Sequence, residues 1–384
     1  MAASGLPGLT PTPIPRRWRR SCVGTRSAYE EGLSMPMPKL SIVILCWNDD
    51  AVIHDAIRTI YEKTKALDFE VIVSDNGSAE GCVKGILEAF PYPNFRVIEN
   101  KANLGFSRGN NTGIAVARGE YILILNPDTL MHDGSLDNLV HFAEQHPEGG
   151  AFGCRAVYPD GTYQPTAMVA PTLTRLWLHA LGLHRLGRFS QLLRSRAYYG
   201  WHGDTEREVD WQSGCCVMFR ATLLKELGGF DPQFFYHCEE VDLCKRVWEA
   251  GYKVLFTPTA EITHIGGQSV KRARTRSDLE THRSFYKYFY KHHGQRGATQ
   301  VRYPIICVLL RRWALARLTA RLKPCELNHQ VADSLAVQIK WNWTLDPVRF
   351  VKYQEEPDLG FAPMGEPVRG FRSTCGSRSL QQVQ

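Results

Sequence analysis

Between residues 40 and 157, short apolar runs alternate with segments in which apolar residues recur at helical spacing. The runs predict strands at 41–46, 70–74, 95–99, 121–125 and 151–157. The segments between them predict helices at 51–64, 82–90, 113–117 and 135–145. Strands that alternate with helices of this length form right-handed βαβ crossovers. The pattern therefore predicts an α/β fold with a mostly parallel central sheet and flanking helices on both faces.

The second half of the chain is less regular. We expect basic amphipathic helices over 173–193. Further elements are predicted as strands at 209–220, 253–256 and 260–263 and as helices at 221–227, 239–250 and 283–292. Residues 301–323 predict either a pair of basic amphipathic helices that lie on a membrane surface or an ordinary packing helix. After Glu326 the sequence shows little periodicity.

These patterns divide the chain into four parts. Residues 1–38 are rich in Gly, Pro, Ser and Arg, and we expect them to be a disordered arm. We also expect translation to start at Met35 or Met37, just before the first strand. The main domain covers 39–295, a basic helical segment covers 296–325, and 326–384 is a poorly defined tail.

Charge and composition change this picture little. The chain has 46 basic and 39 acidic residues, and the resulting net charge of +7 is concentrated around 16–20 and 302–323. We interpret the first cluster as a solvated arm and expect no nucleic-acid partner. The 11 cysteines lie mostly in apolar segments without zinc-ligand spacing, which indicates reduced thiols in a cytosolic protein. Neither a signal peptide nor an apolar run of the roughly 18 residues that a spanning helix needs is found.

The strongest chemical signal is the turn Asn126-Pro127-Asp128, which follows the apolar run 121–125. Ligands bind in the crevice beyond the carboxyl ends of the strands in open α/β sheets. Pro127 stiffens the turn, so Asp128 is held at that edge. A carboxylate there suits a divalent cation that carries a diphosphate.

Two more segments present polar groups near the same edge. Asp75 ends the second strand and is followed by Gly77, so it either accepts a hydrogen bond from a nucleoside or only starts a turn. The segment 103–113 places several glycines, several amides and Arg108 at the mouth of a helix, which indicates a phosphate-binding loop. An ordinary capped loop is the alternative for that segment.

An acidic cluster and a histidine complete the set. Glu239, Glu240 and Asp242 begin a helix after an aromatic segment, and three acids are more than capping needs. A carboxylate near apolar rings has a pKa raised by desolvation, as a general base requires, although the helix dipole opposes this rise. His264 leaves the strand 260–263 before two glycines and is placed to bind a metal together with Asp128.

Taken together, these segments resemble the family 2 inverting glycosyltransferases of the GT-A fold, a Rossmann-like fold for nucleotide-diphospho-sugar transfer. The nearest branch is the rhamnosyltransferase-like enzymes of surface-polysaccharide assembly. The resemblance covers about 40–294 and rests on motifs in this order: Val43-Ile44 through Asn48, Ser74-Asp75-Asn76-Gly77-Ser78, Asn103-Leu104-Gly105-Phe106, Leu125-Asn126-Pro127-Asp128, Gly229-Phe230-Asp231, Glu239-Glu240-Val241-Asp242-Leu243, and His264 through Ser269.

The resemblance implies a role for each candidate residue. Asp128 holds Mg²⁺ or Mn²⁺ on the diphosphate, and His264 completes the metal site. Glu240 is the catalytic base, with Glu239 as the alternative and Asp242 in support. The implied donor-binding residues are Asn48, Asp75, Asn76, Arg108, Asn111, Asn126 and Asp128.

Two positions depart from the family pattern. Asn126 replaces the first acid of the D-x-D motif, which weakens the cation site. Glu240 replaces the commoner Asp and is one methylene longer, so the role of base could fall to Glu239.

The resemblance also implies the partners. The expected donor is dTDP-rhamnose or a UDP-sugar, and the expected acceptor is a glycan on a polyprenyl carrier. A cytoplasmic enzyme of this kind would make a peripheral contact with the inner face of the membrane through 301–323.

Other nucleotide-binding classes fit less well. A dinucleotide-dependent oxidoreductase needs G-x-G-x-x-G after the first strand, and 47–51 contains no glycine. The G-x-x-x-x-G-K-[ST] motif of P-loop proteins is absent from the sequence. A catalytically silent module that only binds a nucleotide sugar is the remaining alternative, and it would not need Asp128, Glu240 and His264 together.

Overall fold

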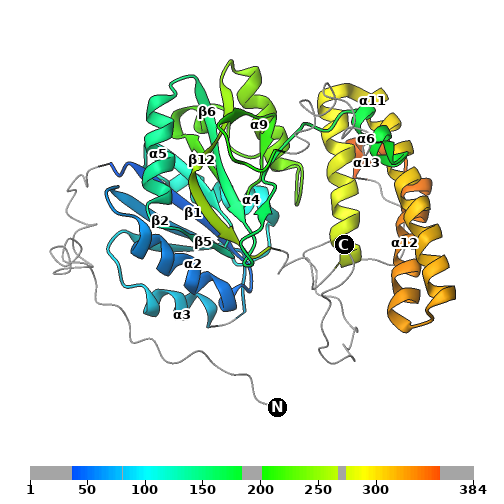
Figure 1. The fold of residues 1–384 in the computed structure, drawn as a ribbon, viewed down its shortest axis with the longest axis horizontal. Helices are drawn as coiled ribbons and strands as arrows, with labels where there is room; N and C mark the ends of the chain where they lie inside the picture. Colours follow the sequence, from blue (N-terminus) through cyan, green and yellow to red (C-terminus); the bar gives the residue numbers. More distant parts are fainter. Residues whose placement is uncertain (1–36, 80, 184–200, 267–273, 355–384) are drawn as a thin grey trace, which may run out of the picture. The chain divides into compact units, whose positions relative to one another are not determined.

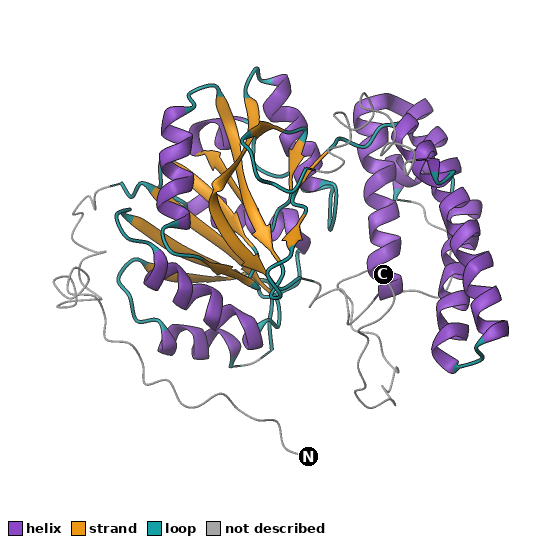
Figure 2. Ribbon diagram, in the orientation of Figure 1, coloured by secondary structure: helices purple, strands orange, loops and turns teal. Residues whose placement is uncertain are grey.

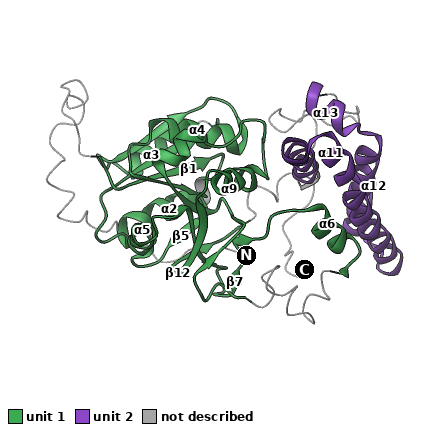
Figure 3. Cartoon of the chain, turned by 90° about the horizontal axis from the view of Figure 1, so that it is seen from above, with its two compact units in different colours: residues 1–272 green, residues 273–384 purple. Residues whose placement is uncertain are grey.

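The computed structural model describes residues 37–79, 81–183, 201–266 and 274–354. Several expectations lie outside these residues: the arm over 1–36, the predicted helix over 184–193, Gln268 and Ser269 of the histidine motif, and the tail after 354. Contacts between residues divide the chain into two compact units, 1–272 and 273–384, which Figure 3 colours separately. Each unit is described by itself.

The first unit is built on one large mixed sheet (Figure 1). Its main strands are β1 (Leu40–Cys46), β2 (Phe69–Asp75), β3 (Phe95–Glu99), β4 (Tyr121–Leu125), β5 (Thr129–Met131), β6 (Gly149–Val157), β11 (Cys216–Arg220) and β12 (Lys253–His264). They run in the order β3-β2-β1-β4-β11-β6-β12-β5. The half that comprises β3, β2, β1 and β4 is parallel, as the sequence predicts, while β11 is antiparallel to both of its neighbours.

Short strands complete this unit. Strand β7 (Tyr163–Gln164) pairs with β6, and β9 (Arg207–Glu208) pairs with β12. Strands β8 (Ala167–Met168) and β10 (Trp211–Gln212) form a separate two-stranded sheet. The helices are α2 (Asp50–Lys63), α3 (Cys82–Ala89), α4 (Gly105–Val116), α5 (Ser135–Gln145), α6 (Leu173–Ala180), α8 (Ala221–Glu226) and α9 (Glu239–Glu249).

Helices cover both faces of the sheet (Figure 2), because successive side chains of each strand point to opposite faces. In β1, Ile42 and Ile44 belong to one buried cluster and Val43 to the other. Helices α2, α3 and α5 contribute Ile53, Ile86 and Leu139 to the first cluster. Helices α4, α8 and α9 contribute Ile114, Leu224 and Val247 to the second cluster. The predicted α/β sheet with helices on both faces is confirmed.

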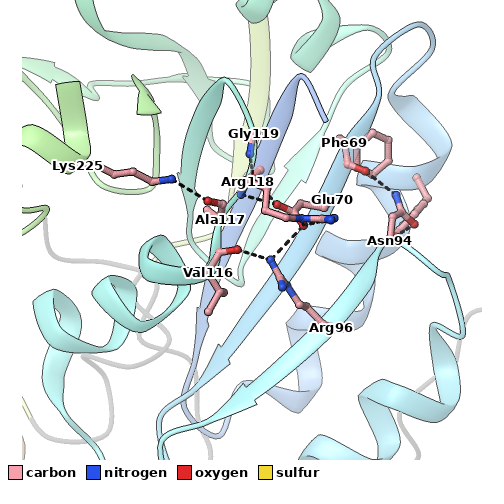
Figure 4. Close-up of polar contacts among 11 residues, drawn as sticks. Phe69, Glu70, Asn94, Arg96, Val116, Ala117, Arg118, Gly119 and Lys225 are labelled. Atoms are coloured by element: carbon pink, nitrogen blue, oxygen red, sulfur yellow. Dashed lines mark hydrogen bonds and ion pairs between the residues drawn. The ribbon is translucent and has the colours of Figure 1, made fainter. Parts of the chain in front are cut away.

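A buried ion-pair cluster closes the end of the sheet where β2 begins (Figure 4). Glu70 is only 3% exposed. It accepts hydrogen bonds from the Ser41 hydroxyl at 2.6 Å, from the Arg118 amide at 2.8 Å, and from the guanidinium groups of Arg118 and Arg96 at 3.0 and 3.1 Å. A buried carboxylate is tolerated there because charged and polar donors surround it.

The second unit is helical. It contains α11 (Arg274–Leu322), α12 (Glu326–Thr344) and α13 (Pro347–Tyr353). Gly294 has φ 67° and breaks α11 into two helical stretches. Of the two alternatives for 301–323, the pair of helices is wrong, because this segment is the continuous second stretch of α11. Helix α12 occupies a segment for which the sequence pattern predicted no element.

Two other expectations were tested by the described residues. All nine cysteines within the described ranges are free thiols, in agreement with the reduced state that the sequence indicates. None of the helices in those ranges is long and apolar enough to cross a membrane.

Candidate active site

Asp128 and His264, which the sequence analysis assigned to a cation, meet at one edge of the sheet. Asp128 follows β4 through the turn that begins at Asn126, and His264 ends β12. Antiparallel pairing places His264 opposite Thr129, the first residue of β5. The His264 Nε2 atom therefore lies 3.2 Å from Asp128 Oδ1, and both side chains are largely buried.

Three neighbours hold this pair in place. Gly266 N donates to Asp128 Oδ2 at 3.0 Å. Asn126 Nδ2 lies 3.2 Å from His264 Nε2, and Gln164 Oε1 lies 3.1 Å from Nδ1 on the other side of the ring. A carboxylate oxygen beside an imidazole nitrogen is a donor set that fits a divalent cation such as Mn²⁺.

Gln164 is a site residue that the sequence analysis missed. It lies on β7, which returns along β6 after a tight turn at Asp160-Gly161, where Gly161 N donates to Tyr158 O at 2.8 Å. An Asp-Gly pair after a strand is a strong hairpin signal. That signal could have predicted the hairpin and the position of Gln164 in it.

Glu239 and Glu240 begin helix α9, as expected. His237 and Cys238 before them have φ of 66° and 67°, which turns the chain sharply into the helix. Gly214 N lies 3.5 Å from Glu240 Oε1, and among the described residues the Oε2 atoms of both glutamates are buried without a hydrogen-bond partner. Burial and the neighbouring charge of Glu240 raise the pKa of Glu239 well above its ordinary value, and burial also raises the pKa of Glu240.

The candidate base and the candidate cation site are neighbours. Burial raises the pKa of the Cys215 thiol to about 12, and the charges of Asp128 and Glu240 both contribute. Burial raises the pKa of Tyr236 to about 12 as well, with contributions from the charges of Glu239, Glu240 and Asp128. The loop 213–215 is near both groups, because Gly214 N lies 3.5 Å from Glu240 Oε1 and Cys215 O accepts from Asn126 N, two residues before Asp128, at 3.0 Å.

Asp75 and Asn48 lie at the ends of two neighbouring parallel strands, β2 and β1. The Asp75 carboxylate accepts hydrogen bonds from Gly77 N at 3.1 Å and from Ser78 N at 3.2 Å. Asn48 N donates to Ser78 Oγ at 2.8 Å. Asp75 therefore starts a tight turn, and its contact with a nucleoside stays a prediction.

Asn76 and Asn111, expected to bind the donor, have their side-chain amides engaged by the protein. Asn76 Nδ2 donates to Gly105 O at 3.0 Å, and its Oδ1 accepts from Asn100 Nδ2 at 3.1 Å. Asn111 Oδ1 accepts from Phe230 N at 2.9 Å, and its Nδ2 donates to Phe230 O at 2.7 Å. Both residues hold loops in position through these hydrogen bonds, and their contact with the donor stays a prediction.

In the segment 103–113, residues from Gly105 onward form helix α4, which begins earlier than the predicted Gly113, and phosphate binding there stays a prediction. At its start, Gly105 N donates to the Asn103 side chain at 3.0 Å and Phe106 N donates to Phe235 O at 2.7 Å. Protein acceptors thus take the first two amides, which the prediction assigned to a phosphate. Arg108 is exposed, and its Nε donates to Pro232 O at 3.2 Å.

Asp242, predicted to support the base, is fully buried. It forms an ion pair with Arg246 at 2.8 Å. The guanidinium of Arg246 also donates to Leu227 O and to Gly229 O, each at 2.8 Å. This ion pair therefore ties α9 to the glycine-rich turn that precedes Phe230.

Comparisons with known proteins place this site in context. Residues 41–228 match the family model described as glycosyl transferase family 2. Over 237 residues the chain is 32% identical to an N-acetylglucosaminyl-diphospho-decaprenol L-rhamnosyltransferase from Mycobacterium tuberculosis, a match that covers 58% of this chain and 75% of that protein. It is 25% identical over 224 residues to the rhamnosyltransferase WbbL of Escherichia coli, with 55% of this chain and 79% of that protein covered.

Among solved structures, the chain is similar to the mannosyltransferase PcManGT from Pyrobaculum calidifontis in complex with GDP-Man and Mn²⁺. The TM-score is 0.48 at 17% sequence identity, and the match covers 79% of this chain and 88% of that one.

Proposed function

Because the chain belongs to glycosyl transferase family 2 and has the GT-A fold, we propose that it transfers a sugar from a nucleoside-diphosphate donor to an acceptor hydroxyl with inversion at the anomeric carbon. The observation that carries this proposal is that the Asp128–His264 pair and Glu240 both lie near the loop 213–215, where Asn126 N donates to Cys215 O at 3.0 Å and Gly214 N lies 3.5 Å from Glu240 Oε1. A base and a cation site are the two parts that a single inverting displacement requires.

Glu240 is the residue that we propose as base. The acceptor hydroxyl gives its proton to the Glu240 carboxylate while its oxygen forms a bond to the anomeric carbon. The bond from that carbon to the diphosphate oxygen breaks, and its electron pair leaves with the diphosphate. Burial supports this role, because it raises the pKa of Glu240 toward the range in which a carboxylate accepts a proton efficiently.

Asp128 and His264 are the residues that would hold a divalent cation. When bound, such an ion supplies positive charge to the departing diphosphate. Because the pair offers one oxygen and one nitrogen, we propose Mn²⁺ in preference to Mg²⁺, which keeps mostly oxygen ligands. The neighbouring Asn126 contributes an amide in place of a second acid, so the site binds the ion weakly without a diphosphate.

For the donor we propose dTDP-rhamnose, with a UDP-sugar as the alternative. The rhamnosyltransferase names of two relatives support this choice. We propose that Asp75, which ends β2, and Asn48, which follows β1, contact the nucleoside, as the family resemblance implies. The acceptor that we propose is a glycan on a polyprenyl diphosphate, supported by the decaprenol acceptor in the name of the mycobacterial relative.

We further propose that the enzyme works at the cytoplasmic face of a membrane and touches it through the second half of α11. Between 301 and 325 there are six basic residues and no acidic one. Leu315, Leu318 and Leu322 on this stretch are 59%, 52% and 73% exposed, and Arg317 and Arg321 beside them are exposed too. Exposed leucines next to arginines suit the headgroup region of an anionic bilayer.

Vesicle sedimentation tests this membrane contact. The full chain is mixed with vesicles of phosphatidylglycerol and phosphatidylcholine, and with vesicles of phosphatidylcholine alone. We expect binding to the anionic vesicles only, and a loss of at least tenfold in the variant Arg317→Glu/Leu322→Ser. The matched control Lys84→Glu/Leu87→Ser changes an exposed pair on α3 and should bind as the unmodified chain does. Equal binding by all three proteins would refute the contact.

Thermal unfolding with a panel of nucleotides tests the transferase proposal itself. The panel comprises dTDP, UDP and GDP, each with and without Mn²⁺. A ligand at about a hundred times its Kd stabilises the folded state by roughly 2.7 kcal/mol. We expect metal-dependent stabilisation that is largest with dTDP and absent in Asp128→Asn. Equal stabilisation without metal would remove Asp128 and His264 from the cation site, and no response to any nucleotide would contradict the transferase proposal.

A further inference from the structure

Gln164 reaches the candidate cation site from a rigid hairpin. Strand β7 pairs with the end of β6 so that Gln164 lies opposite Ala156. On its other side, Ala156 lies opposite Ile262 of β12, two residues before His264. Because residues two apart on a strand point to the same face, this register brings the side chains of Gln164 and His264 together. Their atoms Oε1 and Nδ1 are 3.1 Å apart.

The two amide contacts of the His264 ring agree with one tautomer. An amide oxygen can only accept a hydrogen bond, so Gln164 Oε1 requires a proton on Nδ1. The other nitrogen, Nε2, then carries a lone pair, and the Asn126 Nδ2 amide is placed to donate to it at 3.2 Å. The two amides thus favour the same arrangement: Nδ1–H toward Gln164 and an unprotonated Nε2 toward Asp128.

The opposite tautomer would compete with a cation. With the proton on Nε2, the ring would donate to Asp128 Oδ1, which is 3.2 Å away. A proton bonded to Nε2 would remove the lone pair that a metal needs, whereas the Asn126 amide in the other tautomer leaves Nε2 unprotonated. With the proton on Nδ1, two lone pairs face each other across 3.2 Å, and a cation relieves their repulsion.

We propose that Gln164 is a positioning residue that selects the Nδ1–H tautomer of His264 and so keeps Nε2 ready to bind a divalent cation. The inference rests on the proposed function, since the cation belongs to the transferase site. Partners that orient a metal-binding histidine typically change metal affinity by 10- to 100-fold when they are removed. Gln164 therefore tunes the affinity of the site without touching the ion.

Two substitutions separate this role from a structural one. Gln164→Leu keeps the approximate size of the side chain and removes the acceptor. Gln164→Glu keeps an acceptor oxygen at the same distance along the side chain. We expect Leu to weaken Mn²⁺ binding by 10- to 100-fold and Glu to preserve it. Binding is measured as the loss of the free Mn²⁺ electron paramagnetic resonance signal in the presence of saturating UDP and, in parallel, dTDP.

The tautomer is read directly by nuclear magnetic resonance on metal-free protein. In a ¹H–¹⁵N correlation spectrum of ¹⁵N-histidine-labelled chain, the ring nitrogens of His264 are identified by their loss in His264→Gln. We expect the Nδ1–H form in the unmodified chain and in Gln164→Glu. In Gln164→Leu we expect the Nε2–H form to gain population, because Asp128 then offers the better acceptor. An Nε2–H form in the unmodified chain would overturn the proposal.

A matched control comes from helix α5. Gln145 is exposed, and its Nε2 lies 3.1 Å from His141 Nε2, so Gln145→Leu removes a Gln–His contact outside the site. This variant should change neither the His264 spectrum nor the Mn²⁺ affinity. Identical Mn²⁺ affinity in Gln164→Leu and Gln145→Leu would overturn the role of Gln164. Absence of Mn²⁺ binding in the unmodified chain would instead contradict the proposed function, and the tautomer measurement would still decide whether Gln164 selects the ring form.

Discussion

At the scale of single residues, Glu239 and Glu240 are adjacent acids in different surroundings. Glu239 is 2% exposed, whereas Glu240 is partly exposed and lies near Gly214 N. An acceptor hydroxyl can therefore reach Glu240 more easily than Glu239. The pKa of each carboxyl is raised by burial, so at low pH both are protonated more readily than a solvated glutamate.

The raised pKa of Glu240 predicts how the rate of the enzyme changes at low pH. A base must be deprotonated to act, so the rate falls as the pH drops through the raised pKa of Glu240. We expect kcat to fall about tenfold per pH unit below a midpoint that lies above the ordinary value of 4.5. Initial rates at saturating donor between pH 4 and pH 8 measure this limb. A midpoint at or below 4.5 would contradict burial of the base.

The sequence alone predicts the positions of some residues of the candidate site and misses others. Asp128 and His264 were predictable because each ends a clear apolar strand, and strand ends meet at the edge of a sheet. Gln164 was not predicted, since its role depends on the register of a two-residue strand. Asn76 and Asn111 have the right residue type for ligand binding, but only the fold shows that backbone groups occupy their amides.

At the scale of elements, the turn before α9 is fixed by side chains from other elements. Asn111 of α4 forms two hydrogen bonds with the Phe230 backbone, and Arg246 of α9 binds Leu227 O and Gly229 O. The start of the segment that leads to Glu240 is therefore held by both α4 and α9. Precision of this kind is what a catalytic base needs.

Asn111→Leu tests this clamp. The substitution leaves the Phe230 N–H and C=O without their partners, and we expect a loss of about 1–3 kcal/mol in the free energy of unfolding. Urea unfolding at neutral pH measures it. Asn138→Leu, which removes one exposed bond to Thr259 O, is the control and should stay within about 0.5 kcal/mol of the unmodified chain. Equal losses in the two variants would contradict the clamp.

Elements whose pattern is set by local sequence were predicted well, and those set by close packing were not. The bounds of β3, β4 and α5 agree with the apolar pattern. Most of α4 was predicted as a loop because glycine disfavours helix. A Cβ at Gly109 or Gly113 would lie 2.4 Å from Leu45 or Val43, so these glycines allow the helix to approach the sheet. That reason is visible only in the fold.

Helix α12 was missed for a different reason. Its buried face includes the polar residues Gln338 and Asn342, which interrupt the apolar period that the sequence analysis looked for. Asn342 is satisfied by the Tyr286 hydroxyl at 2.9 Å and by the Gln338 carbonyl at 2.8 Å. A buried polar position of this kind cannot be told from an exposed one in a single sequence.

At the scale of the whole molecule, the buried ion-pair cluster lies where strand β2 begins, and the candidate active site lies beyond the other ends of the parallel strands. Glu70 lies near the start of β2 and Asp75 at its end. Burial alone would raise the pKa of Glu70, but hydrogen bonds from Ser41 and the Arg118 amide and the charge of Arg96 outweigh it and lower the pKa. The cluster (Figure 4) therefore stabilises the fold when Glu70 is charged.

Glu70→Gln should show this contribution through its pH dependence. Because the folded-state pKa is lowered, the stabilisation is present above about pH 4.5 and is lost as the pH falls through the folded value. We expect a loss of about 1–3 kcal/mol at pH 7 and a smaller difference at pH 3.5, measured by urea unfolding. The control Glu88→Gln, in an exposed pair with Lys84, should stay within about 0.5 kcal/mol. A difference that does not shrink in acid would contradict this assignment.

The central claim is that Glu240 acts as the base beside a cation site at Asp128 and His264. The most direct test compares Glu240→Gln with the unmodified chain for two quantities, the turnover of dTDP-rhamnose or a UDP-sugar and the Mn²⁺-dependent affinity for the matching nucleoside diphosphate. We predict that turnover falls by at least 10²-fold while the affinity stays within about threefold. Turnover that survives the substitution, or affinity that falls with it, would contradict the account.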